Sequence, residues 1–271
     1  MGTSYTIHTH GKEVYITSPL LDSLGVRHFF ATRMGGVSEG VFGGWNFAAG
    51  VGKMVDSEEN VLKNYAIAAE KFGLSAGDIC RSYQSHTNLC ITVDDAHRGV
   101  GTTRPKFEFG VDGLVSRTPD LLLSVRTADC VPVLLYDPVA KVCAAVHAGW
   151  RGTVGNITGN AVKEMQALGS DPENLYAAIG PCIGVCCYEV GQEVFDAFAQ
   201  AGELTQCFTP KGEGKYLLDL TLANRIFLQN AGLLPHHIDS ADICTKCHGD
   251  LFFSHRRMGA ERGTMSAFIT V

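Results

Sequence analysis

The chain has 271 residues, of which 45% are hydrophobic and 18% charged, a balance typical of a globular protein and not of a disordered one. Its net charge of −6 argues against a general nucleic-acid-binding protein, which would present a basic surface. Ten cysteines are too few for a disulfide-rich domain of this length. Neither a signal-peptide pattern nor an apolar run of membrane-spanning length is present, so we expect a cytoplasmic protein with reduced thiols and no membrane partner.

Strands and helices follow one another without regular alternation. Strands are expected at 26–32, 89–93, 113–117, 121–127, 131–136, 142–148, 175–180 and 265–270. Helices are expected from Asp56 or Ser57 to Phe72, from Thr153 to Leu168, and near 191–200 and 219–231. This pattern predicts an α+β fold with one mixed sheet flanked by helices. No repeat or linker divides the sequence, which predicts a single domain over residues 1–271.

A predicted hairpin carries the clearest chemical signal. If Tyr136 pairs with Lys141 or Val142 across its turn, Cys130 lies opposite His147 or one place away. Residues directly opposed on antiparallel strands have Cβ atoms about 4.5–5.5 Å apart, which suits two ligands of one metal ion or a thiol and its base. The alternative is two unrelated residues near strand ends, because buried cysteines are commonly inert.

The residues beside this pair favour a functional site. Asp129 precedes the cysteine, and Arg151 lies between two glycines where a strand passes into a helix expected to be capped by Thr153. A helix N-terminus beside glycines and an arginine is a ready anion site. Catalytic zinc usually has three protein ligands, so a third is needed. His86, in the polar segment YQSHTN, is one candidate, although spacing does not select it among the other histidines and cysteines.

Eight blocks of the sequence, taken in order, resemble those of one family. They are TRMGGVSEG at 32–40, YQSHTN at 83–88, VDGLVS at 111–116, TADCVPVLLYDP at 127–138, AAVHAGWRGT at 144–153, IGPCIGVCCYEVG at 179–191, LDLTLANRIFLQNAG at 218–232 and FFSHRR at 252–257. From about Val26 to Phe268 the chain resembles the bacterial laccase-domain proteins of the YlmD/YfiH type. Members of that family were long labelled polyphenol oxidases and are now regarded as zinc-dependent purine nucleoside phosphorylases.

Carried over by motif, the resemblance implies that His86, Cys130 and His147 are zinc ligands. It also implies cleavage of adenosine, inosine, guanosine or methylthioadenosine by phosphate, and deamination of adenosine to inosine. Three ligands leave an open position on zinc, which can lower the pKa of bound water to about 7. The chain departs from the family at Thr87, where glycine is frequent, and at His255, where tyrosine is frequent. These departures concern the loop geometry after His86 and the role of His255.

Other side chains near the motifs complete the expected site. Arg33 and Arg151 are candidates for binding phosphate, because a guanidinium group contacts phosphate through two hydrogen bonds. Asp129 is a candidate for orienting a metal ligand. The expected catalytic set is therefore Cys130, His147, Arg151 and Asp129, with no general acid identified. A surface or structural role is the alternative for Arg33, Arg151 and Asp129.

Other functions stay open on the sequence. In a metal-free cysteine hydrolase, Cys130 would be the nucleophile and His147 its base. A binding protein without enzymatic activity would retain only a structural zinc ion. A copper-dependent polyphenol oxidase is disfavoured, because multicopper sites need several histidine clusters and an axial methionine or similar ligand, whereas the ten histidines here are scattered.

The remaining cysteines have no assigned role. The segment CTKCH at 244–248 matches the haem-attachment pattern, but haem attachment requires export, and no export signal is visible. Half of a structural zinc site is the better interpretation, although a second C-x-x-C is missing. Cys182, Cys186 and Cys187 are close in sequence and are candidates for a redox cluster or a second metal site. Inert thiols are the simpler interpretation.

Overall fold

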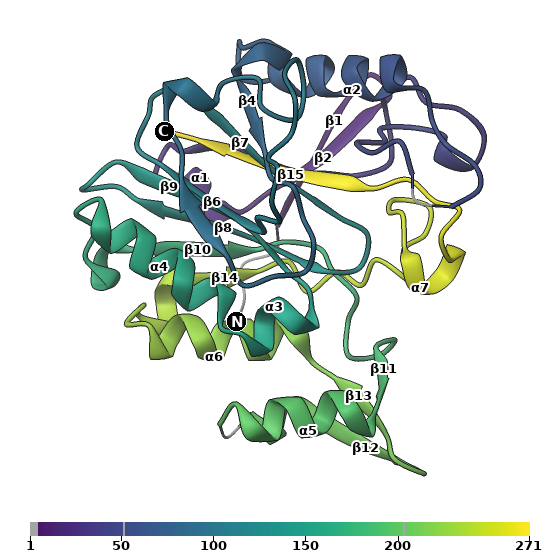
Figure 1. Cartoon of the computed structure of the whole chain (residues 1–271), viewed down its shortest axis with the longest axis vertical. Coiled ribbons are helices and arrows are strands. Elements are labelled where there is room, and N and C mark those ends of the chain that lie inside the picture. Colours follow the sequence, from purple (N-terminus) through teal and green to yellow (C-terminus); the bar gives the residue numbers. More distant parts are fainter. Residues whose placement is uncertain (1–4, 51, 203) are drawn as a thin grey trace.

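Two mixed six-stranded sheets pack face to face in the computed structural model, which describes residues 5–50, 52–202 and 204–271 (Figure 1). The first sheet runs in the spatial order β1 (Thr6–His10), β2 (Glu13–Thr17), β3 (Arg27–Ala31), β15 (Met265–Thr270), β7 (Leu122–Thr127), β4 (Ile79–Arg81). The second runs in the order β14 (Ile238–Ser240), β10 (Tyr176–Ile179), β8 (Val131–Asp137), β9 (Val142–Ala148), β6 (Gly113–Ser116), β5 (Cys90–Thr92). A small sheet contains β11 (Glu189–Gly191), β13 (Lys215–Leu218) and β12 (Phe208–Gly212).

Helices lie on the outer faces of both large sheets. The α-helices are α1 (Pro19–Asp22), α2 (Glu58–Glu70), α3 (Trp150–Val154), α4 (Ile157–Ala167), α5 (Gln192–Gln200), α6 (Leu220–Asn230) and α7 (His255–Met258). The 3₁₀ turns are η1 (Gly40–Phe42), η2 (Ala76–Asp78), η3 (Asp95–His97), η4 (Pro172–Asn174), η5 (Thr205–Cys207) and η6 (Pro235–His237). None of the described helices has the length and apolar character needed to cross a bilayer.

The packing gives four layers. In Figure 1, α2 lies above the first sheet and α4 and α6 lie below the second, while α5 and the small sheet lie at the bottom of the view. Tyr65 of α2 packs with Phe29 and Phe268 of the first sheet. Between the sheets, Leu123 of β7 and Leu134 of β8 belong to one buried cluster. Both faces of β8 and β9 are therefore covered, which explains why their sequences are apolar without alternation.

The α+β fold with mixed sheets flanked by helices is confirmed, but the expectation of one sheet was wrong. The continuous helix expected from Thr153 to Leu168 was also wrong, because α3 and α4 are separate. Asn156 lies in the left-handed region, with φ of 57°, and its side chain caps α4 by accepting from Gly159 N–H. The N-cap of α3 is Gly149, so Thr153 lies inside that helix rather than at its start.

Several short strands were missing from the sequence prediction. They are β1, β2 and β11 to β14. The hairpin of β1 and β2 shows the reason, since β1 reads TIHTH and most of its side chains are exposed. A strand of this kind buries too few side chains to leave an alternating apolar pattern, and backbone pairing alone defines it.

Three connections cross between the two large sheets at one end of the molecule. The segment from β4 to β5, the turn from β7 to β8 and the segment from β14 to β15 each leave one sheet and enter the other. The ends of β4 and β7 are adjacent because these strands are parallel, and β15 begins beside the end of β7. Loops that are far apart in sequence therefore gather at this end.

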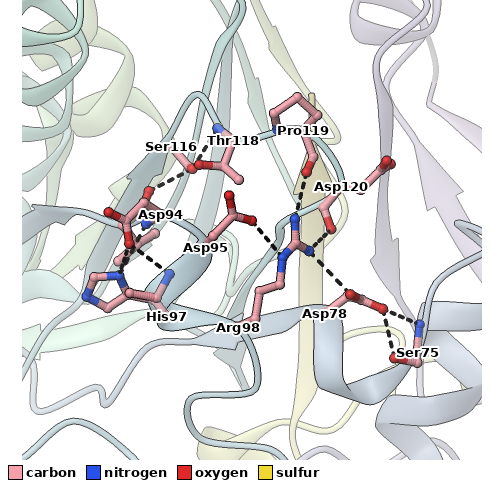
Figure 2. Close-up of polar contacts among 12 residues, drawn as sticks. Ser75, Asp78, Asp94, Asp95, His97, Arg98, Ser116, Thr118, Pro119 and Asp120 are labelled. Carbon is pink, nitrogen blue, oxygen red and sulfur yellow. Dashed lines mark hydrogen bonds and ion pairs between the residues drawn. The ribbon is translucent and has the colours of Figure 1, made fainter.

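At the opposite end of β4, Arg98 joins segments from both sheets (Figure 2). Its guanidinium donates to the carboxylates of Asp95 at 2.8 Å and Asp78 at 3.3 Å. It also donates to the carbonyl oxygens of Asp120 and Pro119, at 2.7 and 2.9 Å. Asp78 precedes β4 in the first sheet, and Asp95 follows β5 in the second. This contact therefore holds two edge strands together, and the segment between them carries His86.

Candidate metal centre

The structure brings His86, Cys130 and His147 together. One potential ligand atom from each lies within 4.8 Å of the others, and Cys130 Sγ is 3.9 Å from His86 Nε2. His86 lies in the crossing from β4 to β5, Cys130 in the crossing from β7 to β8, and His147 near the end of β9. Two imidazoles and a thiol at this separation form a suitable donor set for zinc.

The hairpin register differs from the predicted one by one or two positions. Pro132 pairs with His147, because the turn between β8 and β9 spans residues 138–141. Cys130 therefore lies two positions before the partner of His147, diagonally across the hairpin on the same face. The prediction that Cys130 lies opposite His147 or one place away was wrong, yet a two-residue offset preserves the face and hence the proximity. Pro132 is the second residue of β8, which is a central strand of its sheet.

Asp112, at the entry to β6, connects two of the three residues. Its Oδ1 is 2.7 Å from His147 Nδ1. Its carboxylate also accepts the backbone N–H groups of Ser85, His86 and Thr87 at 2.9–3.1 Å and the Thr87 hydroxyl at 2.8 Å. Asp112 has no role in the site expected from the sequence. The available signal was a single acidic residue in the apolar segment VDGLVS, where a buried charge requires partners.

These contacts set the charge of the cluster. Burial opposes ionisation of Asp112, but hydrogen bonds from His147 and Thr87 outweigh burial and lower its pKa to about 2. Burial likewise opposes the Cys130 thiolate, but His147 and His86 outweigh it and lower the Cys130 pKa to about 6. The thiolate is the form of cysteine that binds metal ions. The Nδ1–H of His147 donates to Asp112, which leaves Nε2 for a metal ion.

The backbone around the cluster has little freedom. His86 adopts φ of 62°, a left-handed conformation that is uncommon for residues other than glycine. Gly149 faces the cluster directly, since a Cβ atom there would lie 2.9 Å from His86 Cδ2 and 3.2 Å from Cys130 Sγ. A side chain at position 149 would therefore occupy space that these two side chains need.

Asp129 lies beside the cluster but contacts other residues. Its carboxylate accepts from Thr245 Oγ1 at 2.7 Å and from Arg256 N–H at 2.6 Å, and its carbonyl accepts from Ile183 N–H at 2.8 Å. Its hydrogen bonds thus go to the two loops that follow β10 and β14, and to none of the three ligand candidates. Asp129 also has a left-handed φ of 100°, which the three bonds help to hold.

A pocket of about 430 Å³ opens beside the cluster. Its wall contains His86, Ala128, Asp129, Cys130, Trp150, Arg151, Ile183, Tyr188, Leu220, His255, Arg256 and Arg262.

Two arginines of this wall, Arg256 and Arg262, were not singled out from the sequence. Arg262 is half-buried, and its Nε has no hydrogen-bond partner among the residues that the structure describes. Burial lowers the pKa of Arg262, while the nearby Asp129 and Cys130 raise it. An arginine beside the cluster is therefore partly unpaired.

The two arginines expected from the sequence lie in different surroundings. Arg151 is in the pocket wall, with its guanidinium 4.3 Å from the centre of the Trp150 ring. The five-residue helix α3 is too short to add an anion site at its N-terminus. Arg33 is not among the residues that line the pocket. Its guanidinium lies over the Phe253 ring and donates to the carbonyl oxygens of Gly43 and Gly249.

Residues 27–271 match a family model described as multi-copper polyphenol oxidoreductase laccase. The chain belongs to this family. A relative named purine nucleoside phosphorylase, from Bacteroides thetaiotaomicron, is 36% identical over 91% of this chain and 92% of its own length. Another relative, named adenosine deaminase RL5, from an unknown prokaryotic organism, is 35% identical over 88% of this chain and 91% of its own. The crystal structure of YlmD from Geobacillus stearothermophilus superposes with a TM-score of 0.89 at 33% identity, over 97% of this chain and 98% of that one.

The resemblance of this chain to YlmD-type and YfiH-type proteins, which its motifs predicted, is thus confirmed. The copper in the family description is harder to reconcile with this chain. A copper site with two histidines and a cysteine normally has a methionine or similar weak axial ligand, and the described residues of the pocket wall include no methionine. The described wall therefore lacks the axial methionine of a blue-copper site.

Proposed function

We propose that this chain is a zinc-dependent purine nucleoside phosphorylase that also deaminates adenosine to inosine. Its nucleoside substrates would be adenosine, inosine, guanosine and methylthioadenosine, and its second substrate inorganic phosphate. The observation that carries this proposal is a cluster of two imidazoles and a thiol beside a pocket with both aromatic and cationic walls. The names of the relatives support the same two reactions.

His86, Cys130 and His147 would hold the zinc ion. Zinc bound there would supply Lewis acidity, which polarises a substrate or acidifies water. Asp112 would orient one of these ligands. It accepts a hydrogen bond from His147 Nδ1 and so leaves Nε2 of the same ring to bind the metal. The thiolate of Cys130 would partly neutralise the divalent charge of a bound zinc ion.

The pocket walls suit the two substrates. A volume of about 430 Å³ lies within the range of about 300–1,000 Å³ for small-molecule sites. The aromatic rings of Trp150 and Tyr188 offer faces for a purine base. Arg151, Arg256 and Arg262 offer positive charge to phosphate. In phosphorolysis a phosphate oxygen bonds to C1′ of the ribose while the bond from C1′ to the purine breaks, and its electrons leave with the base.

His255 is the proposed partner of the departing base. It lies in the pocket wall, and its Nδ1 is 3.0 Å from the carbonyl oxygen of Gly259, to which Nδ1–H donates. This bond leaves Nε2 available to hold a proton for the purine.

A metal-free cysteine hydrolase is the second candidate. The observation that favours it is the series Asp112, His147 and Cys130, because His147 contacts both other groups and the pKa of Cys130 is lowered to about 6. However, a thiol nucleophile needs one imidazole, whereas this thiol contacts two. The second imidazole, His86, is held in a strained conformation, which a metal ligand explains better.

The decisive experiment incubates adenosine with the purified protein, with and without phosphate. We expect adenine and ribose 1-phosphate only when phosphate is present, and inosine in either case. Cys130→Ala should abolish both products and should lower the zinc content by about one ion per chain. A cysteine hydrolase would instead retain full activity after chelation of metal. Lack of turnover of all four nucleosides by zinc-loaded protein would refute the proposal.

Arg262→Gln should raise the KM for phosphate. A hydrogen bond to a charged group contributes about 1.5–3 kcal/mol, so we expect an increase of roughly ten-fold to one hundred-fold. Arg151→Ala should act in the same direction. Phosphate titrations at saturating adenosine measure the effect, and Arg262→Lys, which keeps the charge but not the two-pronged geometry, should recover part of it. An unchanged KM for phosphate in Arg262→Gln would remove this residue from the site.

A further inference from the structure

A second group of metal-binding side chains lies next to the pocket and plays no part in the proposed reaction. It contains Cys186, Cys187, Cys244 and Cys247, whose sulfur atoms all lie within 4.8 Å of one another. We propose that this four-thiol cluster binds one structural zinc ion, and that the ion fixes part of the pocket wall.

The sheet topology brings the two halves of the cluster together. β10 and β14 are parallel neighbours, so the segments that follow them leave the same edge of the sheet. The pairing continues beyond the strands through a bridge between Cys182 and Cys244. Cys182 N–H donates to the Ile243 carbonyl at 3.2 Å, and Thr245 N–H donates to the Cys182 carbonyl at 2.9 Å. A C-x-x-C segment and a C-C segment therefore face each other, although neither alone has four ligands.

The distances agree with one tetrahedral ion. Four thiolates at the usual Zn–S distance of about 2.3 Å have sulfur atoms about 3.8 Å apart. Cys247 Sγ is 3.7 Å from Cys186 Sγ and 3.5 Å from Cys187 Sγ. A disulfide requires about 2.05 Å, and the described cysteines are all free thiols. Adjacent Cys186 and Cys187 are poor disulfide partners, because their Cα atoms are about 3.8 Å apart.

The loop backbone is shaped around the cluster. A Cβ atom on Gly184 would lie 3.2 Å from Cys244 Cβ and 3.3 Å from Cys186 Sγ, so this glycine lets the loop approach the thiols closely. Cys187 N–H and Tyr188 N–H both donate to the Gly184 carbonyl, at 2.9 and 3.1 Å, which turns the loop toward the cluster. Cys244 is buried, Cys187 is half-buried, and the other two thiols are exposed, so an ion can enter from solvent.

The same two loops form part of the pocket wall. One carries Ile183 and Tyr188, and the other continues into His255 and Arg256. Thr245 lies between the two cysteines of the second loop and donates to Asp129 in the pocket. An ion in the four-thiol cluster would therefore hold the aromatic wall against the cationic wall without touching substrate.

Metal analysis of protein purified in reducing buffer without chelators tests the proposal. We expect about two zinc ions per chain in the wild type, one for each cluster. Cys187→Ser combined with Cys247→Ser should lose about one ion, and Cys130→Ala should lose the other while the four-thiol cluster stays loaded. A matched control is Cys182→Ser, on the same loop but outside the cluster, which should keep both ions. Each variant removes the ion of one cluster alone. The four-thiol cluster can therefore be tested even if the protein does not cleave nucleosides.

Cobalt substitution gives a second readout. Cobalt in the Cys130→Ala protein should show strong thiolate-to-metal charge-transfer bands with tetrahedral ligand-field bands, and the double serine variant should lose them. In zinc-loaded protein, the double variant should melt at a lower temperature and show a higher KM for adenosine with a smaller change in kcat. Equal metal content in wild type and double variant would overturn the proposal. So would a disulfide among these cysteines, found by mass spectrometry without reduction, or iron with sulfide in place of zinc.

Discussion

His86 and Gly149 show how single residues shape the candidate metal centre. His86 adopts a left-handed backbone conformation, which is stabilised because the N–H groups of His86 and Thr87 donate hydrogen bonds to the carboxylate of Asp112. Gly149 has ordinary backbone angles, with φ of −73°, so its importance lies in the missing side chain rather than in conformational freedom. The space that a Cβ atom would take is filled by the imidazole of His86 and the sulfur of Cys130.

Gly149→Ala should therefore damage the centre while preserving the fold. Its added methyl group would approach His86 Cδ2 to 2.9 Å, so the ring has to move away from the other two ligands. We expect the zinc affinity to fall by about ten-fold or more, by analogy with changes that disturb ligand orientation. Competition with a chromogenic chelator measures this. Gly77→Ala, where a Cβ atom meets only ordinary contacts, is the control, and equal affinity in both variants would contradict the argument.

At the scale of elements, β6 supports the ligands although it provides none of them. Asp112 comes directly before this strand and contacts both the end of β9 and the crossing from β4 to β5. β6 pairs with β9 in antiparallel orientation and with β5 in parallel orientation, so one carboxylate at its start reaches both neighbours. The position of the carboxylate follows from strand order, which the spacing of residues in the chain does not reveal.

Asp112→Asn should weaken zinc binding without unfolding the chain. The amide keeps the shape of the carboxylate but removes its charge and replaces one acceptor with a donor that faces N–H groups. We expect the affinity for zinc to fall by about 10–100-fold, measured by chelator competition. On the same strand, Ser116→Ala removes a hydrogen bond to the Val93 carbonyl at the far end and should change stability alone. Equal zinc affinities in Asp112→Asn and wild type would exclude this role.

For the whole molecule, the packing of two sheets determines where the site lies. The connections that cross between the sheets place His86, Cys130 and the segment with His255 and Arg262 at the same end of the molecule. Each sheet alone would present only part of this set. The cluster of apolar residues between the sheets, which includes Leu123 and Leu134, therefore supports the geometry of the site from a distance.

Leu134→Ala should destabilise the whole molecule and not the metal centre in particular. Leu134 is fully buried between the sheets, and removal of such a side chain costs about 2–5 kcal/mol through lost burial and the remaining cavity. Denaturant unfolding measures this loss. Val139→Ala, on the exposed turn of the same hairpin, should change stability by less than about 0.5 kcal/mol. If both variants unfolded alike, Leu134 would not contribute to a shared core.

The sequence alone predicted much of the local structure and the identity of the ligand candidates. Ser57 caps α2 as expected, because capping depends on residues next to one another. The long apolar strands were also found, since burial on both faces leaves a continuous apolar pattern. The break between α3 and α4 was missed, because a left-handed Asn156 leaves no periodic signal. The hairpin register was displaced because turn length decides it.

What the sequence determined by itself is the chemistry available: two histidines and a cysteine in recognisable motifs, and pairs of cysteines in two others. Only the tertiary structure decided which of these groups meet. It placed Asp112 behind His147, brought Arg262 to the pocket and left Arg33 outside it, and joined two cysteine pairs into one cluster. The physical reason is that these contacts depend on strand order and on the packing of two sheets. Strand order and sheet packing both depend on the burial of apolar side chains across the whole molecule. The spacing of residues within a short segment does not determine either of them.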